Sequence, residues 1–502
     1  MRISILIFCL FLQTAFSFSQ QKEMYLKSRK EAISKDVQLR FDQDLVLNED
    51  EKKAGLKLQH MQDELLVKYK TEKFFPPSRS FYQSKNTIEN TDLFKVLEKM
   101  PKGGALHLHT EGTTSIGWVV TTAVNQPDCY VYWASDNQKY IKGQIGFFNT
   151  AEVPAGFRKA SELNLTEKDF KRSLTELLTF NEKTTQDSAL VWKEFERCFN
   201  RIRNFVTYKP VFEAYYLEGF KELIRDNIQY AEIRAIVSPS LYDLKHNKQS
   251  NYYSTDSILG YFKNVRLQLK KTDPDFRFRL VYTFIRGMDA VKVDAEYINA
   301  FKMQLKYPDL ISGFDLVGEE DRGHSTLFFL DTWMKRDSLE KAYGIKMPFL
   351  FHDGESNIIS DENMYDAVLL KCQRIGHGFN LFLFPGLYEQ IRKENIAIEI
   401  CPLSSQLLNF TRDLRSHPGI GYLRNGIQCV ISSDDPSIFG FSGLTYDFWS
   451  AFMAWELDLK SLKKLSMNSI QYSTLPAAEK ELAIVQWQKR WDSFIASVNA
   501  VK

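Results

Sequence analysis

The sequence is poor in cysteine and carries almost no net charge, and both shortages narrow what the protein can be. Six cysteines are spread over 502 residues, and none forms a C-x-x-C pair. A chain of this size with so few, widely spaced cysteines has no disulfide framework. The formal net charge of +2 offers no strongly basic surface, so neither nucleic acid nor an anionic membrane is expected as the main partner.

Long apolar runs are also missing after the first twenty residues. No later stretch approaches the ~20 consecutive apolar residues that a transmembrane helix requires. At the amino terminus, MRISILIFCLFLQTAFSFSQ places Arg2 before an apolar run over 3–12, with small residues at Ser17 and Ser19. This pattern predicts a signal peptide over 1–19 and a secreted protein. The alternative is an N-terminal anchor helix, for which the apolar run is short.

Residues 20–98 are charged and helix-like, and they predict a helical extension ahead of the main domain. Asn48 and Glu51 form a capping box at the start of one helix. An apolar stripe follows at steps of three and four, and its members are Ala54, Leu58, Met61, Leu65 and Tyr69. The pair Pro76–Pro77 ends the helical pattern. The stripe must pack either on the main domain or on a second subunit.

From Gly104 onward, short apolar runs alternate with longer helical patterns. The runs lie at 104–109, 229–236, 278–285, 313–318, 348–354, 374–378, 396–402 and 429–435. Eight repeats of strand followed by helix predict an α/β fold, a parallel (β/α)8 TIM barrel over 99–502. The first crossover, 110–228, is too long for one helix and predicts an insertion at about 125–185.

Polar residues gather at the carboxyl ends of these predicted strands, where a barrel of this type has its active site. They are His107, His109, Glu319, His352, Glu355, His377, Asp434 and Asp435, and Gly318 ends the fourth strand just before Glu319. The first two are separated by one residue in a strand and therefore project to the same side. Each residue alone has a plain alternative, such as a core histidine, a tight turn or a helix cap. Together on one rim they would bury several ionisable groups without a purpose.

One zinc ion per chain is the expected cofactor. Its expected ligands are three imidazoles and one carboxylate, which leave a position open for water. These ligands are His107, His109, His352 and Asp434. Zinc lowers the pKa of its water to roughly 7 and so gives hydroxide at neutral pH. His377 is placed to orient that hydroxide, and Glu355 is free to shuttle protons. Because adjacent strand residues alternate, Asp435 faces the substrate.

Several segments resemble the adenosine deaminase family. In the barrel these are MPKGGALHLH, YAEIRA, GFDLVGEE, HDGES, RIGHGF, CPLSSQ and SSDDP. Three others resemble its extracellular branch, the adenosine deaminase-related growth factors, and they are FFPPSRSFYQSK, VWKEFERCF and NSIQYSTLPAAEK. The resemblance covers nearly the whole mature chain, and it implies a barrel of the metal-dependent amidohydrolase type. It also implies a homodimer in which the N-terminal stripe packs between two subunits.

The resemblance further implies the reaction and the partners of each residue. Adenosine or 2′-deoxyadenosine would be hydrolysed to inosine and ammonia by a zinc-bound hydroxide at purine C6. Glu355 would protonate N1, His377 would orient the hydroxide, and Asp435 would accept a hydrogen bond from the N7 side. The Gly318 amide would meet N3, and Trp192 matches a tryptophan that lines the nucleoside pocket.

Three departures from the family pattern stand out. Thr110 and Glu111 occupy positions where the family places the aspartate that helps to hold the ribose, which makes Glu111 the candidate ribose contact. Ser405 stands where asparagine is usual and is interpreted as a structural exchange. Cys129 has no evident partner within 125–185, where the extracellular branch carries a disulfide-closed lobe, so this lobe is reduced or altered.

Two other functions stay open at this point. A barrel hydrolase with the same chemistry could act on a different aminopurine or on a nucleotide. A binding or growth-factor-like protein could use the barrel as a scaffold only. The intact set of metal and proton-transfer residues argues against the second alternative, because a decayed site should have lost at least one member.

Overall fold

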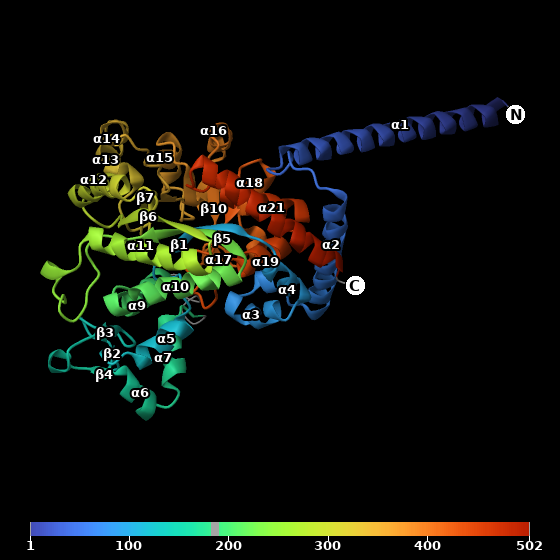
Figure 1. Ribbon diagram of the computed structural model, residues 1–502. Coiled ribbons are helices and arrows are strands. Elements are labelled where there is room, and N and C mark those ends of the chain that lie inside the picture. Colours follow the sequence, from blue (N-terminus) through green and yellow to red (C-terminus); the bar gives the residue numbers. More distant parts are fainter. Residues whose placement is uncertain (1, 182–189, 501–502) are drawn as a thin grey trace.

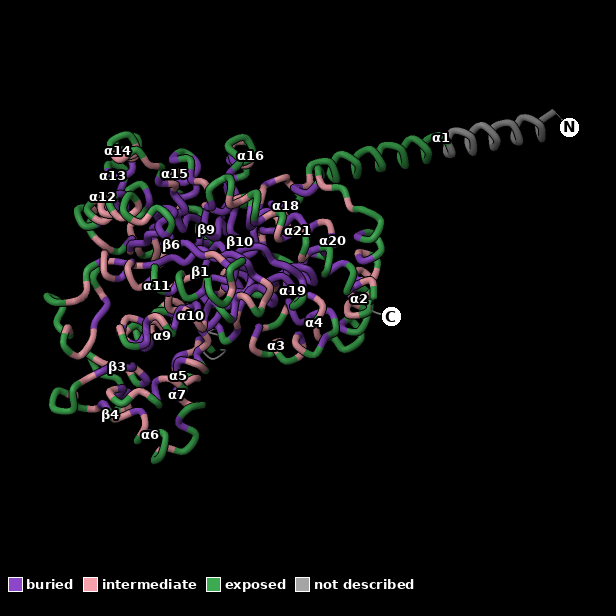
Figure 2. The backbone as a smooth tube through the Cα atoms, in the orientation of Figure 1, coloured by how far each residue is buried: buried purple, intermediate pink, exposed green. Residues whose placement is uncertain are grey.

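The computed structural model describes residues 2–181 and 190–500, with side chains from residue 20 onward. Its centre is a ring of parallel strands, drawn inside a layer of helices in Figure 1. The strands are β1 (Gly103–His109), β5 (Ile228–Ala235), β6 (Arg277–Ile285), β7 (Ile311–Val317), β8 (His352–Asp353), β9 (Arg374–His377), β10 (Ala397–Ile400) and β11 (Cys429–Ile431). All are largely buried, which Figure 2 shows as the purple interior of the molecule.

The strands pair in two parallel sets of four, in the orders β1-β5-β6-β7 and β11-β10-β9-β8. Two isolated parallel bridges join these sets, one between Phe314 and Phe349 and one between Leu108 and Asp434. The ring therefore closes, and the predicted (β/α)8 barrel is confirmed in the part of the chain that the structure describes. The fifth strand is shorter than the predicted 348–354, because Pro348 has no N–H to donate and Gly354, at φ +80°, ends the extended backbone.

Helices cover the outside of the barrel and connect its strands. Those in the main domain are α9 (Val191–Val206), α10 (Lys209–Arg225), α11 (Thr255–Thr272), α12 (Ala290–Lys306), α13 (Leu330–Trp333), α14 (Arg336–Tyr343), α15 (Asn363–Leu369), α16 (Tyr388–Lys393), α17 (Pro402–Leu407), α18 (Gly419–Arg424), α19 (Thr445–Ala454), α20 (Leu459–Gln471) and α21 (Ala477–Ala500). They turn apolar side chains inward, and the exposed green segments of Figure 2 lie on their outer faces.

The N-terminal extension contains one helix that leaves the barrel and several that lie on it. Helix α1 (Arg2–Leu39) projects away from the rest of the chain in Figure 1, and its side chains over 20–39 are exposed. Helices α2 (Glu49–Glu72), α3 (Phe81–Glu89) and α4 (Asp92–Glu98) lie against the barrel. Among the described residues, no helix is both long and apolar enough to cross a bilayer.

The predicted capping box opens α2, since Asn48 and Glu51 exchange side-chain and backbone hydrogen bonds. The helix packs on the barrel of its own chain, which buries three members of the stripe and leaves Met61 and Leu65 half-buried. Packing of the stripe between two subunits stays a prediction. Ala54, Leu58 and Tyr69 are buried against α20, α21 and α4. A stripe shows which face of a helix is covered, but not which surface covers it.

A small lobe occupies the range where the sequence predicts an insertion. Three short antiparallel strands, β2 (Cys129–Tyr132), β3 (Ile145–Phe147) and β4 (Phe157–Lys159), pair in the order β3-β2-β4. Helices α5 (Ile116–Asn125), α6 (Ala160–Thr166) and α7 (Phe170–Leu178) accompany them, and Figure 1 places the strands and α6 below the barrel. Cys129 is a buried free thiol.

Candidate active site

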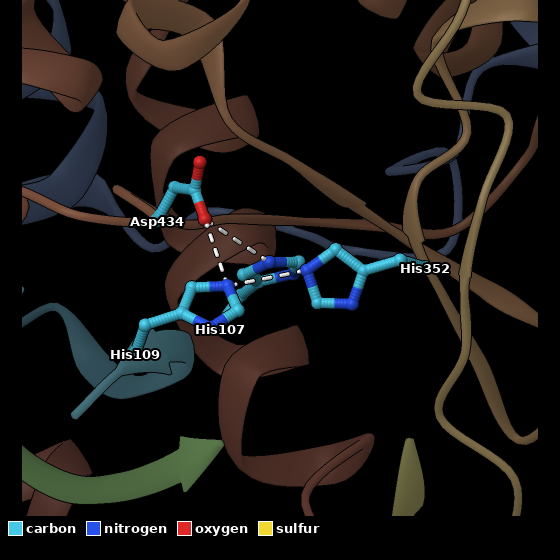
Figure 3. Close-up of side chains that lie close together, drawn as sticks. All are labelled: His107, His109, His352 and Asp434. Carbon is cyan, nitrogen blue, oxygen red and sulfur yellow. Dashed lines mark hydrogen bonds and ion pairs between the residues drawn. The ribbon is translucent and has the colours of Figure 1, made fainter. Parts of the chain in front are cut away.

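Four side chains from three parts of the chain converge at the carboxyl end of the barrel, as Figure 3 shows. The Nε2 atom of His109 lies 3.2 Å from Nε2 of His352 and 3.1 Å from Oδ1 of Asp434. The Nε2 atom of His107 lies 3.4 Å from the same carboxylate oxygen. One ligand atom from each residue falls within 4.8 Å of all the others. Three nitrogens and one oxygen therefore point at one small volume.

The backbone locks β1 to the segment after β11. The Asp434 amide donates to the His107 carbonyl at 3.1 Å, and the His109 amide donates to the Asp434 carbonyl at 3.3 Å. Asp434 adopts φ +63°, so the chain turns at the carboxyl end of the strand. The Ser404 hydroxyl donates to Oδ2 of Asp434 at 2.7 Å and holds the carboxylate.

Buried charged side chains behind His107 and His352 orient the imidazoles of these two residues. Nδ1 of His107 lies 2.7 Å from Oε2 of Glu399, and Nδ1 of His352 lies 2.8 Å from Oδ2 of Asp315. Arg234 donates to both carboxylates, and Arg374 also donates to Glu399. With Nδ1 engaged by a carboxylate, Nε2 of each ring faces the centre, the arrangement typical of metal-bound histidine.

These contacts hold the two carboxylates ionised. Burial alone would raise the pKa of Glu399, but Arg234, Arg374 and His107 keep that pKa well below its ordinary value. Burial would likewise raise the pKa of Asp315, and His352 together with Arg234 lowers it. Glu399 and Asp315 therefore place negative charge behind the imidazoles of His107 and His352.

The converging residues fit a zinc ion. Nε2 of His107 is buried and has no hydrogen-bond partner among the described residues. Burial lowers the pKa of His352 to about 3, which favours the neutral imidazole that a metal requires. Three imidazole nitrogens and one carboxylate oxygen make a ligand set that zinc commonly takes.

Glu355 and His377 form a second pair beside this group. Oε1 of Glu355 lies 3.5 Å from Nε2 of His377, and both side chains are buried. Burial and then the charges of Asp434 and Glu320 raise the pKa of Glu355 well above its ordinary value. Burial and the neighbouring His107 lower the pKa of His377 well below its ordinary value. These shifts favour a protonated carboxyl that faces a neutral imidazole.

Two glycines allow site residues to approach closely. A Cβ at Gly112 would lie 2.3 Å from Oδ1 of Asp435, and a Cβ at Gly376 would lie 2.9 Å from Cε1 of His107. Oδ1 of Asp435 is buried and lacks a partner among the described residues. Burial and the charge of Asp434 raise the pKa of Asp435 well above its ordinary value, which favours the protonated form of this carboxyl.

A cavity of about 320 Å³ opens beside these groups. Its size falls within the range of small-molecule sites. Glu111, Trp192, Gly318 and Asp435, the residues predicted to bind substrate, all line it. Gly318 adopts φ +113°, a conformation that side chains disfavour. Helix α9 supplies one wall, with Trp192, Phe195, Glu196, Phe199, Asn200 and Arg203.

The structure brings all ten residues predicted for the site to one end of the barrel. Sequence reasoning missed the carboxylates and arginines behind the histidines, among them Arg234, Asp315 and Glu399. The signal was present, because Asp315 and Glu399 are each the lone charge in a strand that is otherwise apolar and buried, and Arg234 shares another buried strand with Glu232. The Ser405 exchange lies outside the cavity lining, where the Ser405 hydroxyl lies 3.2 Å from Nε2 of His417.

Comparisons with known proteins find two family models and several relatives that match the chain. The family model described as adenosine deaminase matches residues 167–487, and the adenosine/AMP deaminase N-terminal model matches residues 4–97. Adenosine deaminase 2 from Sus scrofa is 34% identical over 492 residues, which cover 94% of each chain. Adenosine deaminase 2 from Homo sapiens is 33% identical over 510 residues, which cover 97% of each chain.

Solved structures share the fold at lower identity. An arabidopsis N6-mAMP deaminase matches with a TM-score of 0.56 and 16% identity, over 79% of this chain and 99% of that one. An amidohydrolase from Burkholderia ambifaria with bound Zn matches with a TM-score of 0.54 and 15% identity, over 81% and 95%. At this identity the likeness shows the barrel fold alone.

Proposed function

Because the chain belongs to the adenosine deaminase family, and is thus a hydrolase that removes the amino group of adenosine, we propose that it is a secreted, zinc-dependent enzyme acting on adenosine and 2′-deoxyadenosine. One observation carries the zinc part of the proposal. Three imidazoles and a carboxylate converge beside a cavity of about 320 Å³ that also holds a buried, protonated carboxyl. The products would be inosine and ammonia.

We propose that His107, His109, His352 and Asp434 hold one zinc ion per chain. Bound there, zinc would lower the pKa of a water molecule and supply the nucleophile for C6 of the purine. The buried charges of Glu399 and Asp315 support this role, since a carboxylate behind a ligating histidine fixes the ring and increases its basicity.

Glu355 is the proposed proton donor to purine N1. Its raised pKa keeps the carboxyl protonated near neutral pH, the form a general acid needs. Protonation at N1 disperses the negative charge that attack at C6 places on the ring. His377 is neutral and 3.5 Å from Glu355, so it is proposed to orient the attacking oxygen.

The role expected of Asp435 changes in one respect. Adenosine carries no hydrogen on N7, so this atom accepts hydrogen bonds and cannot donate them. A protonated Asp435 can donate to N7, and its raised pKa supports that form. We therefore propose that Asp435 donates to N7 rather than accepts, while the Gly318 amide meets N3.

The ribose is proposed to lie between Glu111 and Trp192. The Thr110 hydroxyl donates to the Glu111 carboxylate, and Nε of Arg203 lies 4.0 Å from it. These contacts hold an acceptor at the cavity wall, where a ribose hydroxyl could donate to it. Glu111 would then replace the aspartate that other family members place one or two residues after the second histidine.

The charges lining the cavity favour a nucleoside over a nucleotide. Glu111 and Glu196 both line it, whereas Arg203 is the one Lys or Arg among its described lining residues. A phosphate dianion near these carboxylates would meet like charge. The alternative of a nucleotide substrate is therefore disfavoured.

The signal peptide over 1–19 and the homodimer remain parts of the proposal. The part of α1 over 20–39 is exposed and is proposed to meet a second subunit. It exposes apolar side chains that include Met24, Leu26, Ile33 and Val37.

A substrate panel tests the proposal. Purified mature protein is incubated with adenosine, 2′-deoxyadenosine and other aminopurines, and both ammonia release and the loss of adenosine absorbance are followed. We expect equal amounts of inosine and ammonia from adenosine, and turnover of the deoxynucleoside. A folded protein that holds zinc but releases no ammonia from any nucleoside would favour the scaffold-only alternative.

A further inference from the structure

Glu320 is a buried carboxylate whose hydrogen bonds all go to the segment that carries Glu355. It lies two residues after Gly318, on the loop that follows β7, and is 5% exposed. Its Oε1 accepts from the Glu355 amide at 2.7 Å. Its Oε2 accepts from the Gly354 amide at 3.0 Å and from Nδ2 of Asn363 at 2.8 Å. Three N–H donors thus converge on one side chain.

The turn that Glu320 holds has little freedom to adopt another shape. Gly354 has φ +80°, and a Cβ there would lie 2.6 Å from Oδ1 of Asn380 and 2.7 Å from Sδ of Met364. The opposite side is tied as well, because the Thr326 amide donates to Oδ1 of Asn363 at 2.8 Å. The loops after β7 and β8 are therefore joined at several points, and Glu320 is the link that holds the amide of Glu355, a residue of the cavity lining.

We propose that Glu320 is a positioning residue that sets the distance between the Gly318 amide and the Glu355 carboxyl, so that both meet one purine ring. Gly318 and Glu355 line the same cavity, and Glu320 joins the two segments that carry them. A planar base held at N3 by one segment needs the proton donor of the other segment at a fixed distance from N1. The inference rests on the proposed function, because it assumes a purine in this cavity.

Burial makes the hydrogen bonds of Glu320 costly to lose. A carboxylate that accepts several N–H bonds makes charge-assisted hydrogen bonds, which are about twice as strong as neutral ones. Removing it would leave the buried amides of Gly354 and Glu355 without acceptors. A shift of about 1 Å in a catalytic group can lower the rate by ~10²-fold. Substrate binding would suffer less, because Trp192 and Glu111 are held elsewhere.

Asp321 offers a matched control. It is the next residue on the same loop, and its Oδ1 accepts from the Ser356 hydroxyl at 2.7 Å. It is exposed, and the amides of Gly354 and Glu355 donate to Glu320 instead. Asp321→Asn therefore removes one negative charge near the same turn while leaving the Glu320 contacts in place.

The experiment measures kcat, KM for adenosine, zinc content and unfolding temperature on wild type, Glu320→Gln and Asp321→Asn. In Glu320→Gln an NH2 group replaces one acceptor oxygen. We expect kcat to fall ~10²-fold, as for misplacement of a catalytic group, with KM within about threefold and zinc unchanged. Asp321→Asn should stay within about twofold of wild type. An unchanged kcat in Glu320→Gln, or an equal loss in Asp321→Asn, would overturn the proposal.

A double-mutant cycle separates positioning from general stability. If Glu320 acts through Glu355, Glu320→Gln should reduce kcat much less in the Glu355→Gln background than in wild type. Fully additive losses would contradict the proposal. Should Glu320→Gln fail to fold, Asn363→Ala tests the same link, with an expected loss in kcat of about tenfold, and an unchanged kcat would count against the link. A wild-type protein that releases no inosine would instead refute the proposed function, so the two failures are distinguishable.

Discussion

Nδ1 of His107 lies 2.7 Å from Oε2 of Glu399, and both side chains are fully buried. This carboxylate fixes the ring so that Nε2 faces the other proposed ligands. Glu399→Gln should therefore weaken zinc binding by roughly 10–100-fold, the effect usual for a carboxylate behind a ligating histidine. Zinc affinity can be measured by competition with a chelator of known strength.

Glu232→Gln is the matched control for this prediction. Glu232 accepts from Arg374, as Glu399 does, and also from the Tyr230 hydroxyl at 2.8 Å, but it is not bonded to a proposed ligand. We expect this variant to lose stability while keeping its zinc affinity. Equal zinc loss in both variants would mean that the arginine network matters and that the His107 contact does not.

His417 should make the protein less stable in acid. Nδ1 of His417 accepts from the Gly419 amide at 3.0 Å, so Nε2 carries the hydrogen and donates to Ser405. Burial lowers the pKa of His417 from 6.5 to about 3. Between these values the unfolded chain binds a proton that the folded chain does not, so this contribution to stability is lost as pH falls from about 6.5 toward 3.

His417→Gln keeps one donor and one acceptor but cannot titrate. The unfolding temperature of this variant should fall less steeply than that of wild type between about pH 7 and pH 5. His60→Gln, at an exposed histidine, should follow the wild-type curve. If the unfolding temperature fell equally steeply with pH in all three proteins, His417 would not contribute to the loss of stability in acid.

Adenosine should be preferred over AMP. Like charges at the cavity wall oppose a phosphate, and we expect kcat/KM for AMP to be lower by ~10²-fold or more. Glu196→Gln removes one of these charges and should shift the ratio several-fold toward AMP at low salt. Glu194→Gln, on the same helix but away from the cavity lining, should leave the ratio unchanged. AMP turnover equal to that of adenosine would contradict the assignment.

The mature protein should be a dimer in solution. Light scattering should report twice the chain mass, and Ile33→Asp with Val37→Asp on the exposed face of α1 should give a monomer. Leu56→Asp, at an exposed position of α2, should leave the dimer intact. A well-behaved monomer for the mature chain would rule out the homodimer.

The barrel and its polar rim were accessible from the sequence for physical reasons. Each strand is a short apolar run, and the carboxyl ends of parallel strands meet at one edge, so the proximity of His107, His352 and Asp434 could be predicted from the sequence. The contacts of the carboxylates behind the histidines could not be predicted in this way. Glu399 lies 292 positions from His107, and no local pattern encodes that pairing.

Other structural features could not be predicted from the sequence, for related reasons. The stripe around Leu58 revealed a buried face but not its partner, and the partner proved to be α20 and α21 of the same chain. The strands of the small lobe, such as β3 (Ile145–Phe147), are too short to carry a periodic signal. In the sequence, Glu320 resembles an ordinary surface carboxylate beside Glu319. Its role as a hydrogen-bond acceptor depends on a loop 34 residues away.

The central claim assigns metal binding and proton transfer to different residues, and one comparison tests it. Zinc content and turnover of adenosine are measured together on wild type, His352→Ala and Glu355→Gln. Wild type should hold about one zinc per chain, lose activity to a strong chelator and regain it when zinc is added.

His352→Ala should lose zinc and activity together. Glu355→Gln should keep its zinc and lose at least ~10²–10⁴ in kcat, the usual contribution of general acid–base catalysis. This pattern of one variant without metal and one with metal but without turnover is the result the account predicts. Near-normal kcat in Glu355→Gln, or full activity in wild type shown to be metal-free, would contradict it.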